Sequence, residues 1–156
     1  MPEIVSKIAE VFIYRKNNEK IEYLLLKRSE DEVYPGIWSI AGGKIKANET
    51  AYQTAYREMR EETGLNAIHF YAVDTVNVFY EVSDDMFHLT PVFLAETDDT
   101  DVVLSDEHTE FKWAEYEEAY EEIHWSAWKK NLKVIEKTLK NENLFRTLKR
   151  IDIQII

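Results

Sequence analysis

The sequence predicts an α/β sandwich formed by one domain, residues 1–156. The chain is 156 residues long, which suits a single domain with a substantial buried core. Segments rich in apolar and β-branched residues occur in both halves, with a helix between them and an amphipathic segment near the C-terminal end. Strands mixed with helices in this way are typical of a sheet covered by helices.

The first two predicted strands are residues 6–14 and 21–28, separated by the polar stretch 15–20. Residues 29–37 are charged and contain a Pro-Gly pair, so they predict a loop. A short apolar piece, residues 38–41, then leads into two consecutive glycines.

The best helix of the first half spans Thr50 to Thr63. Asn48 is its predicted N-cap, and Gly64 is a stop signal. Apolar residues recur every four positions, which predicts one buried stripe: Ala51, Ala55 and Met59.

The second half predicts further strands at residues 67–82 and 86–95, joined by the turn Ser83-Asp84-Asp85. A loop follows at residues 96–101, and residues 111–114 form a short strand. Helices are expected at residues 116–123 and 126–140. The second has one apolar face that predicts core packing: Trp128, Leu132, Ile135 and Leu139. The tail from Asn141 is ambiguous.

Composition limits the functions that the chain can perform. There are no cysteines, which excludes disulfides, thiolate metal sites and cysteine nucleophiles. The apolar runs are too short to span a bilayer, and the N-terminal residues lack the pattern of a signal peptide, so we expect a cytoplasmic protein. A net charge of −11 disfavours nucleic-acid polymers and anionic membranes. It permits a small phosphorylated substrate where divalent cations neutralise the site.

Three acids of the central helix fall on one patch. At roughly 100° per residue, Glu58 and Glu62 project one turn apart and Glu61 lies beside them, at the border of the apolar stripe. Such like charges repel each other, whereas Mg²⁺ prefers carboxylate oxygens and keeps water ligands that a phosphate can replace. Arg57 is placed to pair with Glu61 at i,i+4 and to hold it. A solvated helix face with ordinary salt bridges is the alternative interpretation.

The flanking glycines favour the metal-binding interpretation. Together with the acids they form the pattern G-x5-E-x7-R-E-U-x-E-E-x-G-U, where U is a bulky aliphatic residue. This pattern resembles the Nudix box, and every defining position matches: Gly43, Glu49, Arg57, Glu58, Met59, Glu61, Glu62, Gly64 and Leu65. Many family members have a proline before the two glycines, where this chain has Ala41. That difference removes no ligand, so we do not expect it to abolish activity.

The resemblance implies a Nudix-type α/β/α sandwich with a mixed β-sheet and a loop–helix–loop catalytic motif. It also implies hydrolysis of a nucleoside diphosphate linked to another group, with Mg²⁺ or Mn²⁺ as cofactor. Carried over, Glu58 and Glu62 are the primary metal ligands, Glu61 binds directly or through water, and a backbone carbonyl near Gly42 completes the shell. Arg57 orients the carboxylates, and Glu49 helps to hold the loop.

The general base varies within the family. Our candidate is Glu107, in the loop before the strand at Phe111; a plain surface acid is the equal alternative. The predicted catalytic residues are therefore Glu61, Glu107 and Arg57.

The substrate is the least constrained part. Short segments around Lys27-Arg28 and Asp106 to His108 resemble the dihydroneopterin triphosphate pyrophosphatase branch, which is similar to dATP pyrophosphohydrolases. This implies release of pyrophosphate from a pterin or nucleoside triphosphate, with Glu107 as a third metal ligand. Predicted substrate contacts are Arg28 for phosphate, Gly43 through its backbone, and Trp38 for stacking, with core packing as the alternative for Trp38.

Two alternatives stay open. One keeps the site but changes the substrate to ADP-ribose, a nucleotide sugar or a dinucleoside polyphosphate. The other is a nucleotide sensor without catalysis, which the complete set of box carboxylates disfavours. A homodimer is a further expectation from the resemblance.

Overall fold

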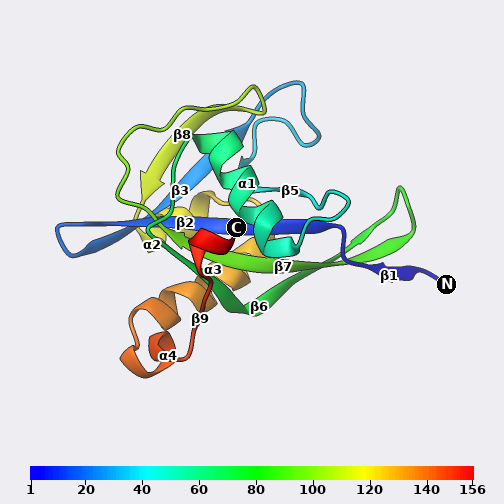
Figure 1. Cartoon of the computed structure of the whole chain (residues 1–156). Coiled ribbons are helices and arrows are strands. Elements are labelled where there is room, and N and C mark those ends of the chain that lie inside the picture. Colours follow the sequence, from blue (N-terminus) through cyan, green and yellow to red (C-terminus); the bar gives the residue numbers. More distant parts are fainter.

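The computed structural model describes residues 1–156 and contains one mixed sheet with helices on both faces (Figure 1). In chain order the strands are β1 (Glu3–Val5), β2 (Ile8–Asn17), β3 (Lys20–Arg28), β4 (Trp38–Ser39), β5 (Ala41–Lys44), β6 (His69–Glu81), β7 (Met86–Glu96), β8 (His108–Ala114) and β9 (Lys149–Arg150). The helices are α1 (Ala51–Thr63), α2 (Tyr116–Glu122), α3 (Ser126–Leu139), α4 (Glu142–Arg146) and the 3₁₀ turn η1 (Ile153–Ile155). The predicted fold class is confirmed.

The sheet is organised around β2. This strand pairs antiparallel with β3 and parallel with β7, so the sheet is mixed. The strand order is β4-β3-β2-β7-β6-β9, with β5 also beside β2, β8 beside β3 and β1 beside β7. The antiparallel β6–β7 hairpin closes through the turn expected at residues 83–85. β5, which contains both glycines, and β3 both pair with β2, so β5 and the end of β3 lie on the same side of the central strand.

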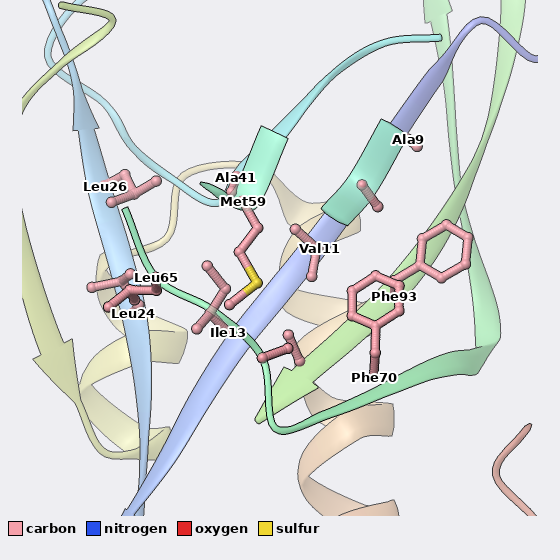
Figure 2. Close-up of a cluster of buried hydrophobic side chains, with 13 residues drawn as sticks. Ala9, Val11, Ile13, Leu24, Leu26, Ala41, Met59, Leu65, Phe70 and Phe93 are labelled. Atoms are coloured by element: carbon pink, nitrogen blue, oxygen red, sulfur yellow. The ribbon is translucent and has the colours of Figure 1, made fainter. Parts of the chain in front are cut away.

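The two faces of β2 supply two cores. Ala9, Val11 and Ile13 face α1, whereas Phe12 and Tyr14 face α2 and α3. Because side chains alternate along a strand, one segment serves both layers. Figure 2 shows the first core, where the fully buried Met59 of α1 lies close to strand residues that include Val11, Leu24 and Leu26. The apolar stripe of α1 is therefore a packing surface, as predicted.

The start of α1 differs from the prediction. Asn48 is not the N-cap: it adopts φ 66° in the preceding turn, and Thr50 caps the helix instead. The Thr50 side chain accepts a hydrogen bond from the Gln53 N–H, and the Gln53 side chain accepts one from the Thr50 N–H. This reciprocal capping box satisfies two donors, so it outcompetes a single cap by Asn48.

Other differences concern short elements. β1, β4, β5, α4, β9 and η1 were not predicted, and β8 begins at His108 rather than Phe111. No helix has the length and apolar character needed to cross a bilayer.

Candidate functional site

Helix α1 carries the acidic patch, and both of its ends are capped. Its first turn is held by the capping box, and the Thr54 hydroxyl donates a hydrogen bond of 2.6 Å to Glu49. Its last turn ends at Gly64, whose φ of 72° suits glycine and whose N–H donates to the Arg60 carbonyl. Between them, Ala55 and Met59 are fully buried. The carboxylates one turn apart are therefore presented from a rigid element.

The two glycines of β5 allow α1 to approach the sheet closely. The Gly42 N–H donates a hydrogen bond of 3.1 Å to Glu62 Oε2. A Cβ atom on Gly43 would overlap the carboxylate of Glu58, so only glycine leaves room for this side chain. Gly42 was expected to contribute a carbonyl; the contact that the structure shows is made by its N–H.

Arg57 joins four groups at the exposed border of the site. It donates to Glu49 at 2.6 and 3.0 Å, to Glu58 at 2.6 Å and to Glu61 at 3.2 Å, and it also reaches the Lys44 carbonyl. The pairing of Arg57 with Glu61 was expected, whereas the stronger contact with Glu49 was not. The guanidinium lowers the pKa of Glu49 to about 2, because it stabilises the ionised carboxylate. Arg57 thus links the loop before α1 to the acids on the helix.

The acids at the centre of the site are difficult to ionise. Glu62 is 3% exposed, and burial raises its pKa to about 10, with further contributions from the charges of Glu58 and Glu107. Burial also raises the pKa of Glu58, against the opposing effect of Arg57. A cation bound beside carboxylates in such a setting would stabilise their ionised form.

Glu107 is brought to this cluster by strand pairing. β8 lies beside β3, and the Ser29 N–H donates to the Glu107 carbonyl at 2.9 Å, which positions the loop before β8. The charge of Glu107 raises the pKa of both Glu58 and Glu62, so the three carboxyl groups lie near one another. The sequence singled out Glu107 only by its place in the loop before the strand at Phe111 and by the resemblance of residues 106–108 to the dihydroneopterin triphosphate pyrophosphatase branch.

The predicted substrate residues lie in different settings. Arg28, at the end of β3, donates through Nε to the Val33 carbonyl at 2.6 Å and lies 3.6 Å from Glu32, so it also holds its own loop. Trp38 is partly buried and packs against the core on the α2–α3 side, and the Lys112 ammonium lies 4.6 Å from its ring centre. Trp38 therefore makes a packing contact, and its stacking on a substrate stays a prediction.

Two buried polar residues beside Glu107 were missed by the sequence analysis. His108 is 5% exposed with its Nδ1 unpaired, and burial lowers its pKa to about 4, so the imidazole is neutral. Ser29 is 7% exposed with an unpaired hydroxyl. No local pattern marks either residue, because their burial depends on the pairing of β3 with β8.

No three acids or histidines are already arranged with the geometry of a closed metal site. Glu58 is engaged by Arg57, and Glu62 by Gly42. The chemistry of the donors nevertheless fits a hard divalent cation, because carboxylates of high pKa meet at a glycine cradle that keeps space for them.

A sequence model of the NUDIX domain matches residues 7–137. The chain belongs to the Nudix family. The matched region includes the whole acidic helix and both glycines of β5, so the features described above coincide with the family domain.

Nudix relatives of known activity cover most of the chain. The asymmetrical bis(5'-nucleosyl)-tetraphosphatase of Caenorhabditis elegans is 34% identical over 120 residues, which are 74% of this chain and 83% of that protein. The CTP pyrophosphohydrolase of Escherichia coli is 32% identical over 124 residues, 76% of this chain and 79% of that protein. This chain is a Nudix enzyme that acts on phosphoanhydride bonds of nucleotide-like substrates.

Solved structures agree with this assignment. A binary complex of the C. elegans Ap4A hydrolase superposes with a TM-score of 0.72 at 28% identity, covering 86% of this chain and 98% of that one. The MutT protein of Methanosarcina mazei superposes with a TM-score of 0.73, covering 90% and 98%; at 24% identity it supports the fold alone. Nudix enzymes generally use divalent metal ions.

Proposed function

We propose that this protein hydrolyses a phosphoanhydride bond in a dinucleoside polyphosphate, with Mg²⁺ as its metal. The observation that carries the chemistry is the convergence of Glu58, Glu62 and Glu107 beside the Gly42-Gly43 cradle. The choice of substrate is supported by the 34% identity to the C. elegans asymmetrical tetraphosphatase.

Glu58 and Glu62 are the proposed principal metal ligands, and Glu61 is a third ligand, direct or through water. Glu61 suits this role because 55% of its side chain is exposed and Arg57 orients it. When bound, the divalent cation neutralises phosphate charge and lowers the pKa of a coordinated water. The acids need such a partner, since a polyphosphate would otherwise be repelled by them.

The chain's own residues divide the remaining tasks. Glu107 accepts the proton of the attacking water, because it lies beside the metal-binding acids on a different element. Arg57 keeps Glu49, Glu58 and Glu61 in position by donating a hydrogen bond to each carboxylate. Arg28 is the proposed phosphate contact at the end of β3, and the backbone of Gly43 lines the approach.

A nucleoside triphosphate is the second candidate substrate, favoured by the 32% identity to the E. coli CTP pyrophosphohydrolase. The same site residues would act on both candidate substrates, which differ only in the leaving group. Dihydroneopterin triphosphate remains a prediction from the sequence.

A panel of substrates assayed with Mg²⁺ tests the proposal. Diadenosine tetraphosphate should yield ATP and AMP faster than CTP yields CMP and pyrophosphate. Glu62→Gln should lower turnover by several orders of magnitude, whereas Glu121→Gln, on the exposed side of α2, should not change it. Faster turnover of CTP would favour the second candidate. Nucleotide binding without turnover, with either Mg²⁺ or Mn²⁺, would contradict both candidates.

A further inference from the structure

Two aromatic rings from distant parts of the chain meet at the surface beside the proposed phosphate contact. Tyr34 lies in the loop between β3 and β4, and Trp125 lies in the connection between α2 and α3. Their ring centres are 5.0 Å apart, and the ring planes are nearly perpendicular, at 85°. Tyr34 is 49% exposed and Trp125 is 37% exposed. We call these two residues the aromatic corner.

Trp125 is the most exposed of the four tryptophans. Trp38 and Trp128 both pack against the core on the α2–α3 side. The indole N–H of Trp128 also donates a hydrogen bond to the buried carboxylate of Glu10. Trp125 and Tyr34 therefore present aromatic surface that the core does not use.

The loop that carries Tyr34 is held on Arg28. The Arg28 side chain donates through Nε to the Val33 carbonyl at 2.6 Å. Its backbone N–H donates to the Ile37 carbonyl, and its carbonyl accepts from the Gly36 N–H, both at 2.9 Å. Tyr34 lies between these anchors with a φ of 56°, a left-handed conformation that is rare for an aromatic residue. The loop therefore keeps the Tyr34 ring close to Arg28.

Trp125 is brought to the same place by its neighbours in the chain. The His124 N–H donates to the Trp38 carbonyl at 3.1 Å, and Ile123 forms an isolated β-bridge with Trp38. Because β4 pairs with the last residues of β3, this connection lies beside the end of β3. Both rings of the aromatic corner are thus held at the end of the strand that supplies Arg28.

We infer that the aromatic corner binds the nucleobase on the leaving side of a dinucleoside polyphosphate. The inference rests on the proposed function and names the second base as a group that the site recognises. A base is flat, so it can stack on one ring while its edge meets the other, perpendicular ring. A nucleoside triphosphate has no base on its leaving pyrophosphate and therefore makes no use of the corner.

The charge of the loop favours a neutral group at this position. Glu30 and Asp31 are exposed, and Glu32 pairs with Arg28, so three carboxylates directly precede the aromatic corner in the loop. Like charges repel, and the free terminal phosphate of a mononucleotide carries more negative charge than the esterified end of a dinucleoside polyphosphate. The neutral base and ribose at that end meet no such repulsion.

Steady-state kinetics with Mg²⁺ test the inference on two nucleotides. Diadenosine tetraphosphate and adenosine 5′-tetraphosphate have the same phosphate chain, but the second has only one base. Trp125→Leu should raise KM for diadenosine tetraphosphate at least about fivefold, because the stacking of one base is lost. The inhibition constant of adenosine 5′-tetraphosphate, measured as a competitor of diadenosine tetraphosphate, should change by less than about twofold.

Matched variants show whether the aromatic ring is responsible. Trp125→Phe keeps a ring and should retain most of the affinity for diadenosine tetraphosphate. Tyr80→Leu is the control, because Tyr80 is a tyrosine of β6 that is 45% exposed outside the aromatic corner, and it should change neither constant. Circular dichroism establishes that each variant is folded, and Tyr34→Leu is the second variant if Trp125→Leu is not.

Tryptophan fluorescence on rapid mixing gives a readout that needs no turnover. Diadenosine tetraphosphate at saturation should quench the parent more than adenosine 5′-tetraphosphate does, and Trp125→Phe should lose this difference. An unchanged KM for diadenosine tetraphosphate in Trp125→Leu would overturn the inference, and so would an equal rise in both constants. Quenching that depends on Trp125 without hydrolysis would contradict the proposed function alone. Hydrolysis with equal quenching by the two nucleotides would contradict the aromatic corner alone.

Discussion

Replacement of Glu62 by glutamine should stabilise the protein at alkaline pH when divalent cations are absent. The pKa of this carboxyl is about 10 in the folded protein and 4.5 in an ordinary setting, chiefly because the folded site buries it. Since the folded pKa is raised, its contribution to stability is fully present below pH 4.5 and is lost progressively as pH rises towards 10. Each pH unit in that window costs at most about 1.4 kcal/mol.

Glutamine has the same shape, cannot ionise and can still accept the hydrogen bond of the Gly42 N–H. At pH 8 the variant should raise the free energy of unfolding by at most about 5 kcal/mol, which for a chain of this size raises Tm by at most roughly 10–20 °C. At pH 4.5 the variant and the parent should melt together. Thermal unfolding with a chelator present measures both values.

Glu121→Gln is the control, because this residue of α2 is exposed and makes no ion pair, so its Tm should match the parent at both pH values. Addition of Mg²⁺ should then stabilise the parent but not Glu62→Gln, since the cation binds the folded parent. The reasoning would be refuted if Glu62→Gln were less stable than the parent at pH 8, or gained equally at both pH values.

Three further substitutions test separate parts of the site. Arg57→Lys should lower kcat at least about tenfold while the Tm falls by only a few degrees, because an ammonium group cannot bridge Glu49 and Glu58 in the same way; steady-state kinetics and melting measure the two effects. Gly43→Ala should weaken Mg²⁺ binding in calorimetry, because the added methyl group displaces the Glu58 carboxylate. Met59→Ala should lower the free energy of unfolding by about 2–5 kcal/mol in urea, because it leaves a cavity under α1.

The strands and helices with strong periodicity were predictable from the sequence. The apolar run of β2 and the four-residue stripe of α1 are local signals, and both correspond to buried surfaces in the structure. β1 and β9 have three and two residues, so they carry no usable period, and only their pairing with distant strands defines them. The N-cap was mistaken although a signal existed: Gln53 stands three residues after Thr50, as a capping box requires.

The candidate site was predictable where its residues share one segment of chain. The box pattern identified the acids of α1 and the glycines of β5 because their spacing is local. The position of Glu107 depends on the pairing of β8 with β3, which no local pattern encodes. The contact of Arg28 with the Val33 carbonyl likewise depends on how one loop folds back, so a predicted phosphate ligand also has a structural task.

The proposed metal site is linked to the stability of the fold. α1 is held on the sheet by fully buried residues such as Ala55 and Met59, and this packing forces Glu58 and Glu62 into a setting that resists their ionisation. The hydrogen bond from Arg57 opposes the rise in the pKa of Glu58. Arg57 makes no hydrogen bond to Glu62, whose partner is the Gly42 N–H. A cation that binds here must displace the proton of Glu62, so its affinity should rise with pH through the neutral range, together with the stability that it confers.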